Sequence, residues 1–581
     1  MNLKIYAMNR PFNSPSLSGW QGVFTTCLIL LIYFLSPSAS AQSFKSYTDL
    51  RGNADPMKFS VHEVIAIPGT SEYVMTGDFK ASAPLFSAGA FLMRADNTGQ
   101  ILLSRLLYTN FPNGTNGVVG RSVAIDPNGN YYVGGASVQN VFLGGGSERT
   151  LTMLNAKGVE LWSRMQSNYS FESVIYNDAD ESILTLSGPV GSAKPNTDMM
   201  VNRLNAKGAA TGSVTLNTAT TDRPVKIIGA PDGGFLALGV YDEFSPQALL
   251  LRLDKNLGKV WSYSFSDNMM TNEPRDIVWH SDGYFAITGL ATATTGESFM
   301  YIMGVDDMGG LLFYNKYESA SGASLIGNGI TTYADENSGK DAGFLVAGTF
   351  TLPVTGRKRG FVLKTDSFGK VIWSHNYSNL TEITDYDRDE TLEDIAYFPG
   401  RKDFVAVGNF TQSLQGVVNL RRLIAVRADA ALGILSEEYN TCAAGFDIFL
   451  SKSSVLNRTS VGIPQSGGGM FGFSYNINDL ETFTDYCAWP TVGAIPPKGS
   501  SGESWVDKFS GTVTITYNLI DYRKDGTLEL FDMQGRLIYL APLNWQQTET
   551  KIPMRENASG AYLLRIRNGG NLVDVRKVLF W

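Results

Sequence analysis

A strand-and-turn phrase that recurs every 50 to 60 residues is the strongest constraint on how this chain of 581 residues can fold. Each copy has an apolar strand, a turn, a second strand with glycine near its end, a third strand ending in Asp or Asn, and a fourth strand after a glycine-containing turn. The clearest copy runs from Val225 through Pro231-Asp-Gly-Gly and Asp254 to Trp261. A repeat of this length is typical of proteins built from stacked copies of one small unit.

Two landmarks in this phrase can be counted independently, and each occurs seven times. The second-strand glycine is found at Gly77, Gly134, Gly188, Gly239, Gly289, Gly348 and Gly408. The turn after the third strand is found at Asp96/Gly99, Asn155/Gly158, Asn205/Gly208, Asp254/Gly258, Asp306/Gly309, Asp366/Gly369 and Asp429/Gly433. Such turns supply the positive φ that tight hairpins need, and a small sheet buries both faces only by packing against neighbours around an axis. The pattern predicts an all-β fold, a seven-bladed β-propeller with four-stranded blades, over residues 42–440.

Tryptophan and the first strand of the array give two further expectations. Trp162, Trp261 and Trp373 fall at one phase of the repeat, so we expect them to pack between blades rather than to contact a ligand. The third and fifth repeats have Gly212 and Phe313 near this phase and are degenerate. Residues 43–50 have the pattern of an isolated fourth strand, which would join the last blade and close the ring. A linear array and an eight-bladed ring are the alternatives.

The phrase resembles the Asp-Gly-Gly-Phe/Trp propeller-like repeats of secreted bacterial proteins, on the strength of copies such as Pro231-Asp-Gly-Gly-Phe235. The resemblance covers about residues 55–440. It implies an architecture and says nothing about activity, because one fold supports many functions.

The N-terminus has the three-part pattern of a secretory signal peptide, which we assign to residues 1–41. Lys4 and Arg10 supply positive charge, an apolar run follows at residues 23–35, and an Ala-Ser-Ala end precedes Gln42. The run is short for a membrane span, so no stable transmembrane segment is expected after its removal, and an uncleaved anchor is the alternative. Export predicts a secreted or outer-surface location.

A sequence rich in Pro, Gly and Ser at residues 490–508 has the composition of a linker, and a compact β segment follows at residues 509–581. This last segment resembles the type A C-terminal sorting domain of the type IX secretion system of Bacteroidota. The matching positions, in order and spacing, are Asp532, Gly535, Gly560, Tyr562 and Lys577. The Asn-Pro step often found near the start of that domain is absent, which blurs the boundary. An ordinary β-sandwich accessory domain is the alternative.

The resemblance implies a small β-sandwich, passage across the outer membrane through the type IX machinery as partner, and release or attachment at the surface, often with removal of the domain. Between it and the repeats, residues 441–489 fit neither pattern, and we interpret them as a cap or connecting segment. Cys442 and Cys487 flank this segment, and they form either one disulfide, which export permits, or two free thiols.

Motifs of catalysis and cofactor binding are absent from the sequence. The three histidines His62, His280 and His375 lie at different repeat phases, and His280 is expected to be exposed in a hairpin turn. Asp385, Asp387 and Asp389 have the odd spacing of a calcium loop, but Glu390 stands where an EF-hand needs glycine. Calcium is thus a hypothesis that titration calorimetry would test, and a solvated acidic loop is the alternative. No other cofactor is predicted.

The net charge of −8 argues against nucleic acid as a partner, because phosphate binding needs a basic face. The sequence favours an exported binding or scaffold protein with a glycan or protein ligand that it does not name. One alternative is a secreted carbohydrate-active hydrolase or lyase with carboxylates gathered at the propeller axis. A structural envelope protein is the other. The lack of catalytic motifs makes a binding protein the better prediction than an enzyme.

Overall fold

The computed structural model describes residues 44–486 and 504–580, apart from internal gaps of which the longest are 81–87, 109–116, 139–147, 190–198, 378–386, 434–443 and 517–525. The described residues are all-β, as the sequence predicts, and include no helix. Ahead of residue 487 their strands form seven antiparallel sheets, numbered 1 to 7 in chain order of their repeats.

The strands of sheets 1 to 3 follow the repeat phrase, with one added strand each from the end of the array. Sheet 1 comprises β3 (Lys58–Ala66), β4 (Tyr73–Lys80), β5 (Ala88–Ala95), β6 (Ile101–Tyr108) and β35 (Asn476–Asp479). Sheet 2 comprises β7 (Gly117–Ile125), β8 (Tyr131–Val138), β9 (Glu148–Leu154), β10 (Glu160–Ser167) and β34 (Phe471–Phe473). Sheet 3 comprises β11 (Tyr169–Asn177), β12 (Ser182–Pro189), β13 (Met199–Leu204), β14 (Ala210–Asn217) and β33 (Ile463–Gln465).

Sheets 4 to 6 have the same construction. Sheet 4 comprises β15 (Asp222–Gly229), β16 (Phe235–Tyr241), β17 (Gln247–Leu253), β18 (Lys259–Ser266) and β32 (Asn457–Ser460). Sheet 5 comprises β19 (Met270–His280), β20 (Tyr284–Ala293), β21 (Ser298–Asp306), β22 (Leu311–Ser319) and β31 (Ile448–Ser453). Sheet 6 comprises β23 (Ser324–Ala334), β24 (Asp341–Thr351), β25 (Lys358–Asp366), β26 (Val371–Asn376) and β30 (Ala444–Gly445).

Sheet 7 joins the two ends of the array. It comprises β27 (Asp387–Phe398), β28 (Asp403–Leu414), β29 (Val417–Asp429), β1 (Phe44–Gly52), β2 (Asp55–Pro56) and β36 (Glu481–Tyr486). The strand expected at residues 43–50 is therefore β1, and it pairs with β29 of the last repeat as predicted. Sheet 7 also shares a hydrophobic cluster with sheet 1, in which Val405 and Val407 meet Phe59 and Val61.

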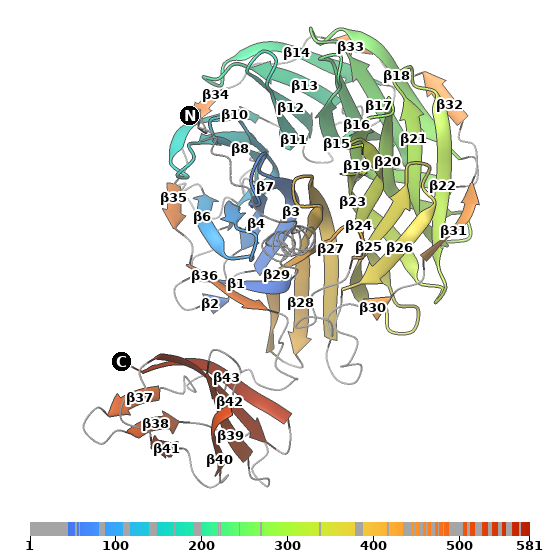
Figure 1. Cartoon of the computed structure of the whole chain (residues 1–581). Coiled ribbons are helices and arrows are strands. Elements are labelled where there is room, and N and C mark those ends of the chain that lie inside the picture. The colour runs from blue at the N-terminus through green and yellow to red at the C-terminus, as the bar shows by residue number, and fades with distance from the viewer. Residues whose placement is uncertain are drawn as a thin grey trace, which may run out of the picture. The chain divides into compact units, whose positions relative to one another are not determined.

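The first strand of each repeat is the innermost strand of its sheet, and residues 444–486 supply the outermost (Figure 1). We call residues 444–486 the outer segment. Its strands β30 to β36 pair with sheets 6, 5, 4, 3, 2 and 1 and then with β1, so the outer segment visits the sheets in reverse order. The four repeat strands per sheet were predictable, but the fifth strand was not, because the outer segment lacks the repeat pattern.

In six of the seven sheets a bulge in the innermost strand faces a glycine of the second strand; in sheet 3 this position holds Ser187, and Gly188 instead lies against Pro224 of sheet 4. In sheet 7 a Cβ on Gly408 would lie 1.7 Å from the carbonyl oxygen of Thr391, and in sheet 1 a Cβ on Gly77 would lie 1.9 Å from that of Ser60. No other residue tolerates this approach of backbone to backbone. In sheet 2 the glycine at this position is Gly135 rather than the neighbouring Gly134 assigned from sequence.

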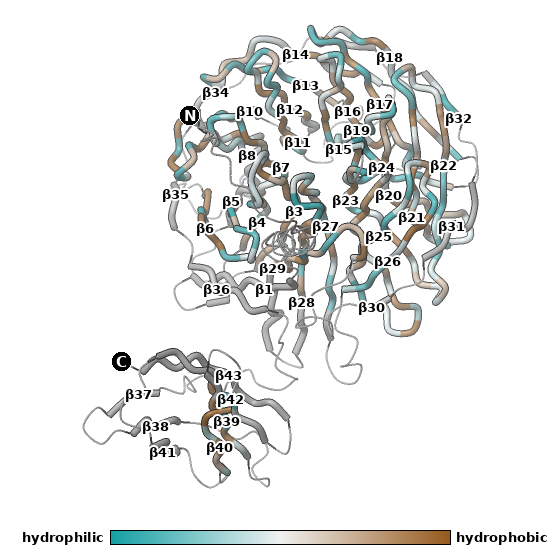
Figure 2. The backbone as a smooth tube through the Cα atoms, viewed as in Figure 1, coloured by the Kyte–Doolittle hydropathy of each residue, from teal (hydrophilic) through white to brown (hydrophobic). Residues whose placement is uncertain are grey.

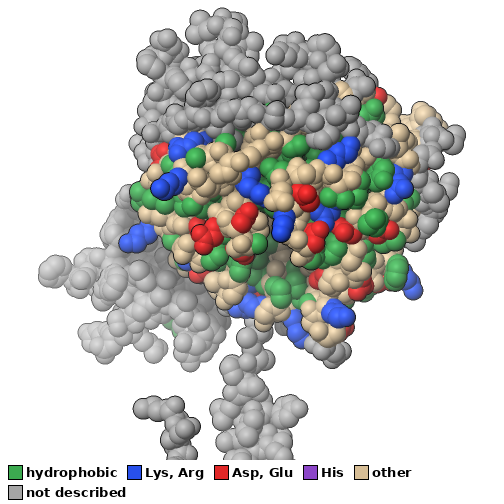
Figure 3. Space-filling model, turned by 90° about the horizontal axis from the view of Figure 1, so that it is seen from above, with side chains coloured by type: hydrophobic (Ala, Val, Ile, Leu, Met, Phe, Trp, Pro, Cys, Tyr) green, Lys and Arg blue, Asp and Glu red, His purple; other side chains and the backbone are tan. Residues whose placement is uncertain are grey.

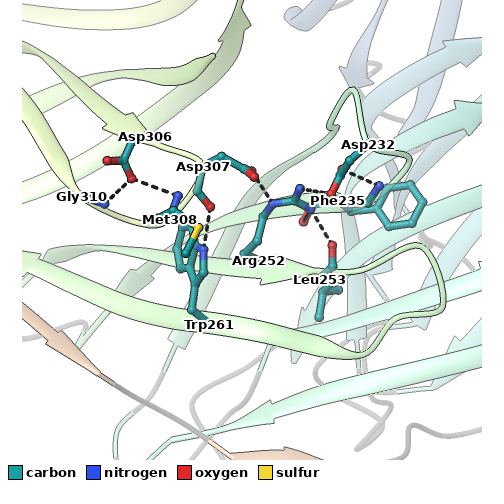
Figure 4. Close-up of polar contacts among 10 residues, drawn as sticks. Asp232, Phe235, Arg252, Leu253, Trp261, Asp306, Asp307, Met308 and Gly310 are labelled. Atoms are coloured by element: carbon teal, nitrogen blue, oxygen red, sulfur yellow. Dashed lines mark hydrogen bonds and ion pairs between the residues drawn. The ribbon is translucent and has the colours of Figure 1, made fainter.

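The turn before the fourth strand supplies the contacts between one sheet and the next. As expected, Trp162, Trp261 and Trp373 pack between sheets: each indole N–H donates to a carbonyl in the next sheet's turn, at 2.9, 2.9 and 3.0 Å. In sheet 4 the buried Arg252 adds ion pairs to Asp232 of its own sheet and Asp307 of the next (Figure 4). Each net hydrogen bond of this kind stabilises by about 1 kcal/mol, and more where a charge takes part.

At the junction between sheets 3 and 4, which lacks the tryptophan, the large and the small residue have exchanged sides. Between sheets 2 and 3, Trp162 lies over Gly208, where a Cβ would be 2.9 Å from the indole. Between sheets 3 and 4 the large residue comes from the opposite side: Leu257 in the turn lies against Gly212, which holds the tryptophan position. Leu257 is buried and takes the positive φ of 66° that glycine has in the other turns. Burial of its side chain offsets the cost of about 1 kcal/mol for that backbone conformation.

Hydrophobic clusters fill every interface between consecutive sheets that the described residues cover, so the core is a series of layers. Figure 2 shows hydrophobic stretches along strands within the sheets and hydrophilic stretches on outer strands such as β18 and β22.

Two further sheets follow residue 503. One is β37 (Ser504–Asp507), β38 (Thr512–Thr516) and β41 (Glu549–Pro553); the other is β40 (Leu537–Leu543), β39 (Gly526–Asp532), β42 (Gly560–Asn568) and β43 (Asn571–Phe580). Strand β37 lies within the stretch of linker composition.

The inverted junction makes a testable prediction. Gly212→Trp should clash with Leu257 and lower the free energy of unfolding by about 1–3 kcal/mol, and Leu257→Gly should lower it by about 2–4 kcal/mol through the cavity it leaves. The double variant should recover at least about 1 kcal/mol relative to the sum, because it restores the tryptophan-over-glycine arrangement. Urea unfolding of the four proteins measures this coupling. Gly212→Ala, whose Cβ fits beside Leu257, is the neutral control, and additive single effects would contradict the interpretation.

Candidate functional site at the bulges of the innermost strands

Every innermost strand has a bulge at the same phase of the repeat. The residue pairs between which the register shifts are Val61/Glu63, Gly120/Ser122, Phe171/Ser173, Pro224/Lys226, Pro274/Asp276, Gly327/Gly329 and Leu392/Asp394. A bulge inserts one residue and re-aims the side chains beside it, and bulges are frequent next to functional sites. The bulges therefore define two sets of side chains across the seven sheets. One set comprises the bulged residues, and the other comprises the residues that follow them.

Four of the seven residues after the bulges are charged, and we call them the axial cluster: Glu63, Lys226, Asp276 and Asp394, from sheets 1, 4, 5 and 7. The three carboxylates are buried, while the Lys226 side chain is 24% exposed. The Nζ of Lys226 lies 2.7 Å from Oδ1 of Asp276 and 3.5 Å from Oε1 of Glu63. Side chains of Glu63 and Asp276 are only 10% and 4% exposed. Carboxylates buried to this degree need partners for their charge, and one shared ammonium group does not neutralise three of them.

The remaining partners are backbone amides of the next sheet. Asp394 accepts from the N–H of Val64 at 2.8 Å, Glu63 from that of Val123 at 2.6 Å, and Asp276 from that of Ile330 at 2.7 Å. In sheet 2 the Ser122 hydroxyl takes this role: it accepts from the N–H of Val174 at 2.9 Å and donates to Glu63 at 2.7 Å. One side chain of each of these sheets thereby binds the backbone of its neighbour.

Burial and charge perturb the titration of the axial cluster. Burial raises the pKa of Asp394 to about 8, although Lys226 opposes the shift. Burial likewise raises the pKa of Glu63. Burial alone would lower the pKa of Lys226, but Asp276, Asp394 and Glu63 outweigh it and hold the amine protonated. The raised pKa lets Asp394 take up a proton at a higher pH than an ordinary aspartate, and that proton reduces the excess negative charge around Lys226.

The bulged residues themselves form a second, half-exposed set, and together with their partners we call them the rim. Arg121 of sheet 2 faces Glu172 of sheet 3 at 3.7 Å, while Glu273 of sheet 5 pairs with Arg223 of sheet 4 at 2.5 Å and with Arg275 at 3.2 Å. The other rim positions hold a His62–Asp78 pair, Asn328, and a Glu393 carboxylate that accepts from Asn409 at 3.2 Å.

The two sets differ in what they can do chemically. The axial carboxylates are occupied by backbone N–H groups and by Lys226, so they position the strands. The rim offers guanidinium, carboxylate, amide and imidazole groups with side chains such as those of Arg121 and Arg223 about 40% exposed. Such groups can exchange their present partners for those of a polar ligand at small cost, because exposed ion pairs contribute little.

Sequence reasoning missed both sets, although a signal for them exists. In six of the seven first strands two residues interrupt the apolar alternation just before a Val or Ile, as in His62-Glu63-Val64, Arg275-Asp276-Ile277 and Glu393-Asp394-Ile395; the fourth repeat has Val225-Lys226-Ile227. Alignment of the repeats on this doublet would have marked the bulge, because an extra residue changes which face the following side chains occupy.

The residues named as a calcium site are only partly described. Asp385 lies outside the described residues, and Asp387 is the first residue of β27. Asp389 accepts from the N–H of Lys358 at 2.9 Å. Within the described part of the chain no three His, Cys, Asp or Glu residues are grouped as metal ligands would be. Calcium binding stays a prediction, and so does a Cys442–Cys487 disulfide, because both cysteines also lie outside the described residues.

The expectation for His280 was wrong. Its side chain is fully buried, stacked on Tyr284 with ring centroids 4.6 Å apart, and Nδ1 accepts from the N–H of Asp282 at 3.2 Å. Burial lowers the pKa of His280 and so keeps it neutral. The turn sequence suggested exposure, but the neighbouring sheet covers the turn through Phe344 and Asp341.

The described residues of the sorting motif lie on three strands of the four-stranded C-terminal sheet: β39, β42 and the edge strand β43. Asp532 at the end of β39 lies opposite Tyr562 of β42, and Lys577 of β43 lies opposite Leu563. Gly560 begins β42, while Gly535 is outside the described residues. Leu528, Leu530 and Leu564 of this sheet are buried and form the described part of its core.

The family model of the secretion system C-terminal sorting domain matches residues 509–580. Residues 509–580 are a type IX sorting domain. The sorting domain identifies the protein as one exported by the type IX secretion system, to the cell surface or the medium. Its first matched residue coincides with the boundary expected from the sequence, although the Asn-Pro step is missing.

Two solved structures are similar to this chain at low sequence identity. No curated protein matches the chain. A Dyadobacter fermentans protein of unknown function is similar at 9% identity and a TM-score of 0.35, over 67% of this chain and 99% of its own. The WD40 domain of SCAP from fission yeast is similar at 12% identity and a TM-score of 0.31, over 64% of this chain and 96% of its own.

No helix among the described residues is long and apolar enough to cross a membrane.

The raised pKa of Asp394 predicts a pH-dependent stability. Because the folded protein binds this proton more tightly than the unfolded chain, the free energy of unfolding should fall as the pH rises from 3.8 towards 8. Asp394→Asn keeps the group neutral, so its Tm should fall less than that of the wild type between about pH 6 and about pH 9. Asp254→Asn, which places Asn where two other turns already have it, is the control. Calorimetric Tm values with equal slopes for all three proteins would contradict the assignment.

Proposed function

We propose that the protein is an exported binding protein in which sheets 1 to 7 are the blades of a closed seven-bladed propeller. The contacts between sheet 7 and sheet 1 support closure. Strand β1 pairs with β29, and Asp394 binds the N–H of Val64. The buried Arg427 of sheet 7, held by Asp403 at 2.9 Å, also donates to the carbonyl of Ser71 at 2.7 Å.

The rim is the proposed ligand-binding surface, and one observation carries this proposal. The bulged residues of five innermost strands are partly exposed and ionisable, whereas sheets 4 and 6 have Val225 and Asn328 there. Arg223 and Glu273, two residues before the bulges of sheets 4 and 5, add a further ion pair beside this row, and the described ion pairs join these groups to each other or to neighbouring residues. A polar surface repeated around an axis suits a ligand with many hydrogen-bonding groups, such as a glycan or a polar protein segment.

The charge of the described surface narrows the class of ligand. Figure 3 shows acidic and basic side chains interspersed over the face that it displays, without a patch of one sign. Nucleic acid recognition needs a continuous basic face, so it is not proposed. Export by the sorting domain puts the propeller where polysaccharides and proteins of the cell surface or medium are the available ligands.

Catalysis by the axial carboxylates is less well supported than binding. A glycoside hydrolase needs one carboxyl group to donate a proton and another to attack or activate water. Here Asp394, Glu63 and Asp276 each bind a backbone N–H of the next sheet, and withdrawal of one of them would leave that amide unpaired. The cost of about 1–3 kcal/mol for each such loss favours a structural role for these groups.

A binding screen with matched variants tests the rim. The chain from residue 42 onwards should bind at least one member of a panel of immobilised polysaccharides and surface proteins, without forming products. Arg223→Ala/Arg275→Ala should weaken that binding by about tenfold or more, because it removes two rim cations. Lys207→Ala/Lys255→Ala removes the same charge from two exposed turns and should leave the affinity unchanged.

Three outcomes would contradict the proposal. Equal loss in both double variants would indicate a general charge effect and remove the rim from consideration. Turnover of a polysaccharide that disappears in Glu63→Gln would favour a hydrolase. Silence across the whole panel would favour a structural role. Equal Tm values for the two double variants establish that lost binding is not lost folding.

A further inference from the structure

The outer segment ends on the strand that joins the first and last repeats. Its strands pair with six sheets in reverse order, and the last of them, β36, pairs with β1 rather than with a fourth strand of a repeat. Strand β1 therefore has β29 on one side and β36 on the other. We call the junction of β1 with β29 the seam.

The ladder with β36 is longer than the ladder that forms the seam. Strand β1 is opposed to β29 at five residues, Phe44 to Thr48, and to β36 at six, Ser46 to Arg51. Without β36, β1 would be an edge strand held by the shorter ladder with β29 and by two residue pairs with β2, at Arg51 and Gly52. Edge strands held on one side open locally more easily than strands paired on both sides.

The outer segment also binds side chains at a junction between sheets. Arg458 of β32 donates to the carbonyl oxygen of Gly309 in sheet 5 at 2.6 Å, and its guanidinium lies over the Tyr263 ring of sheet 4, 4.3 Å from the centroid. One residue of the outer segment thus bridges two consecutive sheets. The segment is attached along its path and not only at its end.

We propose that the outer segment is a latch: the pairing of β36 with β1 holds the seam, so the propeller stays closed only while residues beyond the last repeat are in place. The inference rests on the closed propeller proposed above and adds to it a dependence on a segment that the repeats do not contain. Closure then requires contacts between residues 430 to 440 positions apart. Such contacts form late in folding, because the loop that they close is long.

Substitution within β36 of the full-length exported chain, with Cys442 and Cys487 changed to Ser throughout, tests the latch. Phe483→Pro/Thr484→Pro removes a ladder N–H whichever of the two faces β1, since proline has none. Phe483→Val/Thr484→Val at the same positions keeps both N–H groups. Hydrogen exchange measured by mass spectrometry should be about tenfold faster or more in β1 and β29 of the proline variant. Exchange in β16 and β17 of sheet 4 should be unchanged.

A cross-link at the seam separates the latch from a general folding defect. Ser46→Cys and Ala425→Cys are opposite one another in β1 and β29, and their disulfide should restore slow exchange to the proline variant. Equal exchange in the proline and valine variants would overturn the latch. Faster exchange in every sheet that the disulfide does not correct would overturn it too. Failure of the disulfide to form in the otherwise unsubstituted chain would instead refute the closed propeller.

Discussion

The sheets of this structure are held together at their inner side by one kind of hydrogen bond. A side chain that follows a bulge accepts from a backbone N–H of the next sheet. Asp394, Glu63, Ser122 and Asp276 make this contact in four of the described sheets. The bulge that aims them also brings a carbonyl against the neighbouring strand, which is why that strand carries glycine. The same bulge turns the preceding residue outward and so creates the rim. One local irregularity, repeated with the sequence, gives the packing of the sheets, the buried charge and the candidate ligand surface together.

The outer side of each junction is held by a different set of contacts. There the turn after the third strand offers its carbonyls to the preceding sheet, and Trp, Arg, Asn or Tyr side chains donate to them. Because the donor varies while the turn is constant, the repeats can diverge in sequence without losing the junction. Trp162 over Gly208 and Leu257 over Gly212 are an example: at both junctions a large side chain packs against a glycine, but the two residues come from opposite sheets.

Export and the proposed binding belong to separate parts of the chain. The sorting domain directs the protein to the type IX machinery, whatever the repeats bind. The repeats contribute a rim whose groups are exposed enough to exchange partners, and an axial cluster whose groups are not. The strands of the outer segment pair with the sheets, and in the sequence the segment lies between the repeats and the sorting domain.

Sequence patterns alone were enough to predict the all-β class, the four strands of each repeat, the tryptophan junctions and the sorting domain. Each of these follows from short-range patterns: turn glycines, strand alternation, or a motif of fixed spacing. Only the tertiary structure decided the axial cluster, the rim, the burial of His280 and the path of the outer segment. These depend on which distant strands become neighbours: Glu63 meets Lys226 and Asp276 only because three sheets bring their bulges together. Neither the spacing of residues along one strand nor their propensity contains that information, because it arises from packing between sheets.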